Sequence, residues 1–301
     1  MEKESITENA NEPEKLKEEV RINDFYDYAT KRNEVLKNIP ESEVKSFINE
    51  AVKEIDLLEE TAERDKRKFD LPNEIAKNIG AIWIFSSSGT YFEPKKEDRY
   101  KNYPWADWMD RTRLNHAIKL ARKITEKVSG QDFKAPLSEI VLTKRKTKEA
   151  ILNYGPYIVY NGAPLENEAV ARALTQEGTI IPKEKVDIIE KDIKNTIEQI
   201  TTFKLPDKFE KGKEIALVAH APHLIRIVRM INKYKPFPEG TKTRLFPVPT
   251  PTEGKEEYAK MEVSGTLYYT HITKDATKEP YPYEISYPLP KCSLGAYGFE
   301  I

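Results

Sequence analysis

The chain has 301 residues, 33% charged and 39% hydrophobic, enough for one large domain or two small ones. Its formal net charge of −1 gives no global reason to expect binding to nucleic acid or to an anionic membrane. Its one cysteine, Cys292, excludes an internal disulfide framework and a cysteine-based zinc site. Because no apolar run approaches the ~18 residues of a membrane span, we expect a soluble cytoplasmic protein.

The N-terminal quarter is acidic and predicts helices. Residues 1–70 carry 13 Lys and Arg against 20 Asp and Glu, a net charge of −7. Residues 1–21 contain no aromatic residue, so we expect a disordered acidic tail. Residues 22–70 show two helical patterns with a break near Pro40, which predicts a helical hairpin packed on the main body or on a partner protein.

The first strand candidate is the apolar run Gly80–Phe85, which leads into Ser86, Ser87, Ser88 and Gly89. Small residues after a buried strand let backbone N–H groups approach a ligand, and hydroxyl groups add donors. The run lacks the lysine of a P-loop and the spaced glycines of a dinucleotide site, so an ordinary polar loop is an equal alternative.

Two helices are predicted next. Asp110–Val128 carries an apolar stripe at helical spacing, and its Arg113 lies near the N-terminal end. From there an arginine can reach an anion beside the first strand. Residues 135–153 form the second predicted helix, and its basic centre is typical of a solvated face.

A second strand, Tyr157–Tyr160, ends in a turn formed by Asn161 and Gly162. The helix Glu166–Gln176 follows, with Glu168 in its first turn. This is again a strand, a tight turn and a helix.

A third strand, Val186–Ile189, is followed directly by Glu190. The predicted helix Asp192–Phe203 follows, with Asn195 and Thr196 close to the strand end. Polar side chains thus follow each strand in turn.

The strongest motif joins the buried strand Ile215–Ala219 to a helix that starts near Pro222, a residue suited to a first helical turn. His220, His223 and Arg226 lie in the turn and the first helical turns, where free N–H groups favour an anion. The alternatives are a helix start with a solvated histidine and a surface arginine, and a metal site on the two histidines.

Strands alternating with helices of ten or more residues predict a three-layer, Rossmann-like, mostly parallel sheet over residues 71–252. A fifth strand, Leu245–Val248, meets Pro247, Pro249 and Pro251, which suggests an edge or the end of the sheet. Residues 253–301 are rich in Tyr, Thr and Pro without helical periodicity, so we expect a small β-rich extension in which His271 is structural.

Five motifs in this order carry a family resemblance across residues 79–250. They are GAIWIFSSSG; Arg113, Leu114, Ala117 and Leu120; Asn161-Gly162 with Asn167-Glu168-Ala169; Glu190, Asn195, Thr196 and Glu198; and Val218, His220, His223 and Arg226. Together they resemble the bacterial family typified by the YdcF, SanA and ElyC proteins, a Rossmann-like domain of largely undefined activity. The positions that depart from the family pattern are Ser86, Ser87, Ile193, Gln199 and His220, which implies altered specificity or lost activity if those positions bind ligand.

The leading hypothesis is a small anionic or nucleotide-type ligand, S-adenosylmethionine included, bound at the carboxyl ends of the strands. Arg113 and Arg226 would clamp the anion, and His223 would act as general acid or base. Glu168 or Glu190 would orient His223 or accept a hydrogen bond from a ribose hydroxyl. The predicted ligand-binding residues are Ser86, Ser87, Ser88, Gly89, Arg113, Asn161, Gly162, Glu190, Asn195, Thr196, His220 and Arg226.

Phosphoester hydrolysis or group transfer is the reaction we expect of an enzyme with this site. The alternative is a non-catalytic binding or scaffold protein on the same fold, with the acidic helical arm and the tail as partner surfaces.

Overall fold

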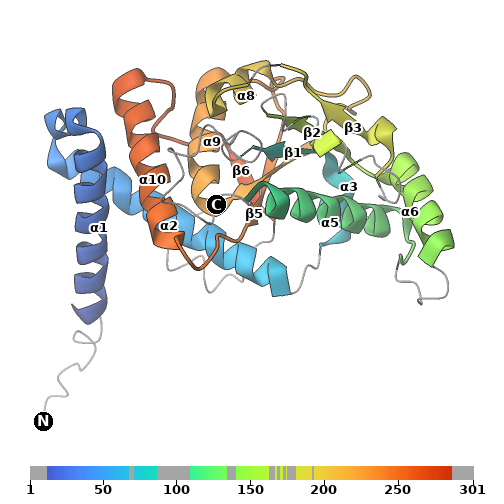
Figure 1. The fold of residues 1–301 in the computed structure, drawn as a ribbon, viewed down its shortest axis with the longest axis horizontal. Coiled ribbons are helices and arrows are strands. Elements are labelled where there is room, and N and C mark those ends of the chain that lie inside the picture. The colour runs from blue at the N-terminus through green and yellow to red at the C-terminus, as the bar shows by residue number, and fades with distance from the viewer. Residues whose placement is uncertain are drawn as a thin grey trace, which may run out of the picture.

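A parallel sheet of six strands forms the centre of the described chain (Figure 1). The computed structural model describes residues 12–67, 71–86, 109–133, 140–162, 167, 170, 171, 174, 181–191 and 193–286. The strand order is β3-β2-β1-β4-β5-β6, and all neighbouring strands are parallel. This is the Rossmann order, so the predicted fold class is confirmed. The strands are β1 (Ile79–Phe85), β2 (Tyr157–Asn161), β3 (Val186–Ile188), β4 (Glu214–His220), β5 (Thr243–Val248) and β6 (Tyr283–Ile285).

The central strands bury both faces, which is why each appears in the sequence as a continuous apolar run. Trp83 of β1 is in register with Leu217 of β4, which is in register with Leu245 of β5, and all three face one hydrophobic core. Neighbouring residues in the same strands, such as Ile82 and Ala216, face a second core. Four predicted strands, those that became β1 to β4, are confirmed to within one residue at each end.

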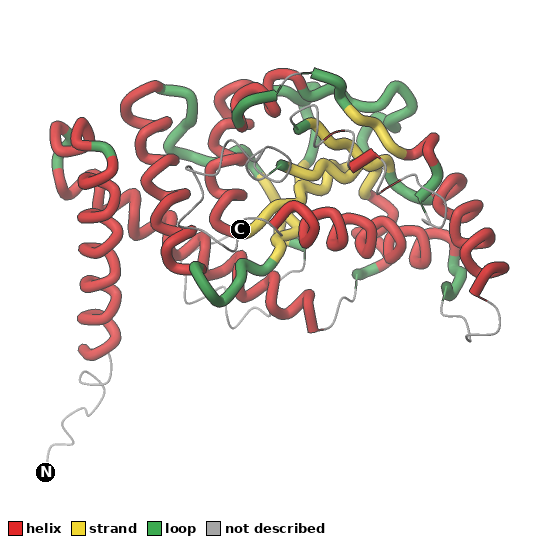
Figure 2. Tube along the Cα trace, in the orientation of Figure 1, coloured by secondary structure: helices red, strands yellow, loops and turns green. Residues whose placement is uncertain are grey.

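Helices cover both faces and complete three layers (Figure 2). Those on the face of Trp83 are α2 (Glu41–Arg67), α8 (Thr196–Thr202), α9 (Ala221–Tyr234) and α10 (Lys255–Tyr268). Those on the other face are α3 (Asn73–Asn78), α5 (Met109–Ser129) and α6 (Ile140–Tyr154). Within the described part of the chain, no helix combines the length and the apolar composition that crossing a lipid bilayer requires.

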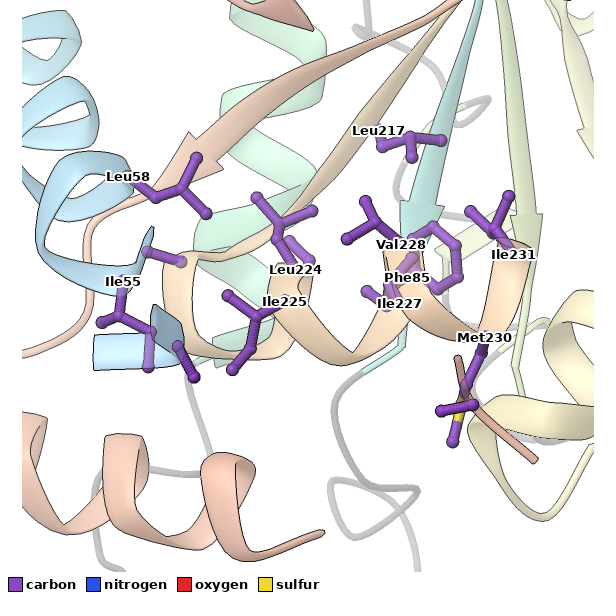
Figure 3. Close-up of a cluster of buried hydrophobic side chains, with 14 of the residues drawn as sticks. Ile55, Leu58, Phe85, Leu217, Leu224, Ile225, Ile227, Val228, Met230 and Ile231 are labelled. Atoms are coloured by element: carbon purple, nitrogen blue, oxygen red, sulfur yellow. The ribbon is translucent and has the colours of Figure 1, made fainter. Parts of the chain in front are cut away.

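Helix α9 lies at the centre of the larger core. Its predicted stripe, which includes Leu224 and Ile227, is fully buried. Ile225 and Met230, outside that stripe, are also fully buried, because α2 and α10 cover the side of α9 that faces away from the sheet. Figure 3 shows side chains of α9 lying between strand residues such as Leu217 and the residues Ile55 and Leu58 of α2.

The N-terminal arm begins earlier than predicted. Helix α1 (Glu12–Arg32) includes residues 12–21, which we expected to be disordered; residues 1–11 lie outside the description. Arg21 explains part of the difference, because it pairs with Asp56 of α2 at 2.6 Å and with Glu256 of α10 at 3.1 Å. The predicted helical hairpin is confirmed: α1 is followed by a short 3-10 helix, η1 (Glu34–Asn38), and by α2.

The expected β-rich extension is wrong for most of its described length. Residues 255–268 form α10, and Tyr269–Thr273 form a π-helical turn, η6, that contains His271. Helix α10 packs against α1, α2 and α9, so buried residues occur around most of its circumference. A helix covered on several sides has no single apolar stripe, which is why periodicity did not reveal it.

Strand β5 is not a sheet edge, contrary to the prediction. Beyond it lies β6, which pairs with Thr243, Arg244 and Leu245 only. Pro247 follows the last of these pairs and therefore leaves the β5–β6 ladder intact. Three residues of β6 were too short a run to be distinguished from the surrounding Tyr and Pro residues.

A buried carboxyl group fastens the end of β6 to α2. Asp65, in the last turns of α2, is 3% exposed and accepts a hydrogen bond from Ser286 Oγ at 2.9 Å. Burial raises the pKa of Asp65 to about 6, and the Ser286 hydroxyl and Arg64 only partly oppose that shift. The fold therefore favours the protonated, neutral form of this side chain.

Replacing Asp65 with Asn is expected to stabilise the protein at pH 7 to 8. Between about pH 4 and pH 6 the unfolded state binds fewer protons than the folded state, so the stability of the wild type falls as pH rises through this window. D65N removes that loss. Its free energy of unfolding should exceed that of the wild type by at most ~3 kcal/mol above pH 6, and the difference should vanish below about pH 4. Denaturant unfolding at pH 4 and pH 7.5 measures both values.

The matched control for this measurement is D56N. Asp56 belongs to the same helix, is 46% exposed and pairs with Arg21. Its loss should change the free energy of unfolding by less than about 1 kcal/mol at either pH. An equal effect of D65N at both pH values would contradict the raised pKa of Asp65.

Candidate functional site

The candidate site lies where β1 and β4 run side by side and end. Helix α5, after β1, packs on the face of Ile82, whereas α9, after β4, packs on the face of Trp83. Chains that leave neighbouring parallel strands toward opposite faces open a crevice at the carboxyl ends, which is where ligands bind in open α/β sheets. Buried and partly buried polar residues gather there. The switch-point cluster, as we call it, consists of Arg113, His220, His223, Arg226, Tyr258 and Glu262.

Arg113 joins three elements at this place. Its side chain is completely buried. Nε donates to His220 Nδ1 at 2.8 Å, and one Nη donates to the backbone oxygen of Phe85 at 2.8 Å. The other Nη lies 3.3 Å from the hydroxyl of Tyr258 on α10. The guanidinium therefore fixes the ends of β1 and β4 against α10, and its predicted role as an anion clamp remains a prediction.

His220 has a fixed tautomer. Because Arg113 donates to Nδ1, the proton of the neutral imidazole is on Nε2, which lies 3.2 Å from Thr112 Oγ1. Burial, then the charge of Arg113 and that of His116, lower the pKa of His220 well below 6.5. With both nitrogens engaged, His220 is a positioning residue. Its engaged Nδ1 also argues against the metal-site alternative for His220 and His223.

His223 differs from His220 because, among the described residues, only one of its two ring nitrogens has a partner. Nε2 lies 3.4 Å from Thr196 Oγ1 at the start of α8. Nδ1 is buried and makes no hydrogen bond to any residue that the structure describes. Burial, then the charges of Arg226 and Arg113, lower the pKa of His223 well below 6.5, so the imidazole is neutral at pH 7. A buried polar atom of this kind gains free energy from a hydrogen bond, so Nδ1 is a contact point that a ligand group could use.

The N-terminus of α9 is buried and carries no side-chain cap. His220 is the N-cap residue and makes no capping hydrogen bond, and Ala221 and Pro222 are buried. The first N–H groups of a helix have no partner within the helix and carry partial positive charge. His223 lies in this same first turn, so its Nδ1 and the helix end belong to one site.

Arg226 is held by α10. Its Nε lies 3.0 Å from one carboxylate oxygen of Glu262, and one Nη lies 3.3 Å from the other. Tyr258 is also hydrogen-bonded to Glu262. Sequence reasoning missed Tyr258 and Glu262 because it assigned their segment to a β-rich extension. Their spacing of four residues, which puts both on one face of a helix, was the available signal.

The predicted residues at the end of β2 have structural roles. Asn161 is fully buried; its amide donates to the backbone oxygen of Gln199 at 2.6 Å and accepts from Trp83 Nε1 at 2.9 Å. The N–H of Gly162 already donates to Asn167 Oδ1 at 2.8 Å. Protein groups therefore engage the side-chain amide of Asn161 and the N–H of Gly162, and a ligand-binding role for these two residues stays a prediction.

The remaining predicted residues divide by position. Asn195 is the N-cap of α8 and accepts from the N–H of Glu198 at 2.9 Å, so its role is capping. Glu190 is exposed beside edge strand β3, which β2 separates from β1. Ser86 is buried directly after β1. The predicted residues that lie outside the description are Ser87, Ser88, Gly89 and Glu168.

The structure thus brings Arg113, Thr196, His220, His223 and Arg226 to one edge of the sheet. Among the residues that the structure describes, no three His, Cys, Asp or Glu side chains gather into a group able to hold a metal ion. Comparison with protein-family models, with curated proteins and with solved structures finds no match to this chain.

Replacing Arg113 with Lys is expected to lower the free energy of unfolding by about 2–4 kcal/mol. Lysine keeps the charge but cannot reach His220, Phe85 and Tyr258 together, so buried acceptors lose their donors. Denaturant unfolding measures the loss.

The control is R145K on α6, an exposed arginine paired with Glu149, which should stay within about 0.5 kcal/mol of the wild type. An R113K protein as stable as R145K would show that the buried guanidinium does not fasten the strand ends.

Proposed function

We propose that this protein binds a small anionic ligand at the carboxyl ends of β1 and β4. The observation that carries the proposal is His223, whose buried Nδ1 has no partner in the described structure and which lies in the uncapped first turn of α9. A ligand oxygen at this place would meet the helix N–H groups and the imidazole together.

The charges of the cluster support an anion over a cation. Arg113 and Arg226 carry two positive charges against the one carboxylate of Glu262, and both histidines are neutral at pH 7. Phosphate- and carboxylate-bearing molecules fit such a site, and nucleotides and S-adenosylmethionine belong to this range. The motif resemblance to the YdcF, SanA and ElyC family, which includes His223 and Arg226, supports the same positions. A bacterial, cytoplasmic setting is part of the proposal, and the single cysteine fits it.

If the ligand is turned over, His223 is the residue to which we assign proton transfer. Its imidazole is neutral, and Thr196 orients its Nε2. His220 is unsuited to this role because Arg113 occupies its Nδ1. The reaction class we propose for such an enzyme is phosphoester hydrolysis or group transfer, in which a positioned imidazole can donate or accept the proton of the leaving or attacking oxygen.

Ligand binding is tested by thermal shift against inorganic phosphate, nucleotides, S-adenosylmethionine, sugar phosphates and polyphosphates. A ligand at a hundredfold excess over its Kd should stabilise the wild type by about 2.7 kcal/mol. The variant H223A should lose at least ~1 kcal/mol of this ligand-induced gain, whatever its stability without ligand, because it removes a contact to the anion.

The control variant is H271A. His271 lies in the π-helical turn at the far end of α10, with Nδ1 3.8 Å from Glu43. The ligand should stabilise H271A against unfolding by as much as it stabilises the wild type. The proposal fails if no anion stabilises the wild type, or if both histidine variants respond to the ligand equally.

The second candidate function, a scaffold that binds through the N-terminal arm, is favoured by one observation on α1. Leu16 and Val20 are four residues apart on this helix and are 64% and 62% exposed. Two large apolar side chains on one face of a helix can pack against a partner protein.

Replacing Leu16 and Val20 with Glu tests this second candidate. Because both residues are exposed, the free energy of unfolding of the double variant should stay within about 0.5 kcal/mol of the wild-type value. Under the scaffold function it should lose partner capture from cell extract while retaining anion binding. Unchanged partner capture would rule out this face of the arm.

A further inference from the structure

Two further buried polar residues adjoin at the carboxyl end of β5. Glu59 of α2 is 3% exposed, and Thr250, which follows β5, is 4% exposed. The N–H of Thr250 donates to Glu59 Oε2 at 3.3 Å. Glu59 Oε1 and Thr250 Oγ1 are buried as well, and neither makes a hydrogen bond to a residue that the structure describes. Each of these atoms gains free energy from a hydrogen bond, so this Glu59–Thr250 pair offers two contact points to a ligand group.

Helix α10 connects the Glu59–Thr250 pair to the switch-point cluster. Lys255, the first residue of α10, places Nζ 3.1 Å from Glu59 Oε2. Tyr258 and Glu262 follow Lys255 by three and seven positions, so all three side chains lie on one face of the helix. Lys255 and Tyr258 are about 4.5 Å apart along the helix axis. The pair and the cluster thus contact successive turns of the same helix face.

The strand ends give a similar separation. Val248, the last residue of β5, is in register with His220, the last residue of β4, and Thr250 lies two residues beyond Val248. Neighbouring strands of a sheet are about 4.8 Å apart. The pair therefore lies about one strand spacing to the side of the cluster, a separation that one small molecule can span.

The contacts of the pair favour a neutral hydroxyl group as its partner. Glu59 already faces the ammonium of Lys255, so a metal cation would meet a positive charge there, whereas an anionic group would meet the carboxylate. A hydroxyl group can donate to a carboxylate oxygen and accept from a threonine hydroxyl, and it brings no charge into a buried place. The side chain of Lys255 is 42% exposed, so the pair adjoins the solvated start of α10.

We infer that Glu59 and Thr250 form a subsite for ligand hydroxyl groups beside the anion site, so that the ligand is a hydroxylated anion of the sugar-phosphate class. This inference rests on the proposed function, because the anionic group of the same ligand would occupy the switch-point cluster. It narrows the range of anions to those that carry hydroxyl groups next to the phosphate.

Ribose 5-phosphate and tetrahydrofurfuryl phosphate are suitable probes. Both carry a phosphate monoester on a five-membered oxygen-containing ring, and the second lacks the ring hydroxyl groups. The measured quantity is the hydroxyl preference, defined as the Kd of tetrahydrofurfuryl phosphate divided by the Kd of ribose 5-phosphate, from calorimetry at constant ionic strength. In the wild type it should be at least ~10, because a carboxylate and a hydroxyl group contribute hydrogen bonds to ribose 5-phosphate alone.

The variant T250V removes one of the two contacts. It keeps the backbone N–H that donates to Glu59 and loses a hydroxyl that bonds to no described residue, so it should fold as stably as the wild type. Its hydroxyl preference should fall at least ~3-fold. The conservative variant T250S keeps the hydroxyl group and should stay within about twofold of the wild type.

The variant E59Q removes the other contact. The N–H of Thr250 and the ammonium of Lys255 both require an oxygen, so the amide nitrogen of the glutamine takes the place of Oε1. This nitrogen cannot accept a hydrogen bond from a ligand hydroxyl, and the hydroxyl preference should fall at least ~3-fold. If E59Q folds poorly, T250V and T250S still decide the test.

Two exposed neighbours supply matched controls. Glu60 follows Glu59 on α2, and Thr252 lies two residues after Thr250. E60Q makes the same change of charge as E59Q, and T252V makes the same change of side chain as T250V. Both should keep the hydroxyl preference within about twofold of the wild type, because water competes for exposed polar groups. A control that shifts the preference as far as its buried counterpart would overturn the inference.

The outcomes separate this inference from the proposed function. If the wild type binds neither phosphate, the proposed function fails and the inference fails with it. If the wild type binds both phosphates equally, or if T250V and E59Q leave the hydroxyl preference unchanged, the hydroxyl subsite is wrong and anion binding stands.

Discussion

The structure depends on one buried guanidinium, that of Arg113. Parallel strands that end side by side leave backbone oxygens and polar side chains at their carboxyl ends, where a Rossmann-like sheet has its crevice. Arg113 satisfies Phe85 O on β1, Nδ1 of His220 on β4 and the hydroxyl of Tyr258 on α10. Its hydrogen bond also fixes the tautomer of His220. A charge that is costly to bury thus gives the ends of β1 and β4 a defined geometry.

The sheet was predictable from sequence because its central strands are buried on both faces. Runs such as Ile215–Ala219 contain apolar residues alone, and the helices between them show clear stripes. The polar residues after each strand were harder to interpret, since sequence gives their position but not their partner. Asn161 and His223 both follow or adjoin strand ends. The side chain of Asn161 is engaged by protein groups, whereas Nδ1 of His223 makes no hydrogen bond within the described part of the chain.

The part of the site that sequence analysis missed comes from α10. Its packing on three other helices removes the periodic apolar stripe. The Lys, Glu and Ala residues of its first half favour a helix, whereas Val263, Thr266 and Tyr268 in its second half favour a strand. Tyr258 and Glu262 therefore reach the cluster from a segment without an apolar stripe, more than thirty residues after His220.

Helix α10 also connects the arm to the crevice. On its outer side, Glu256 and Lys260 are paired with Arg21 and Asp24 of α1, while Glu262 contacts Arg226 on the inner side. Proteolytic loss of the arm would expose one side of a helix whose other side contributes Tyr258 and Glu262 to the switch-point cluster. If the cluster binds an anion as proposed, its affinity would depend on the arm, and by thermodynamic linkage bound ligand would protect the arm from proteolysis.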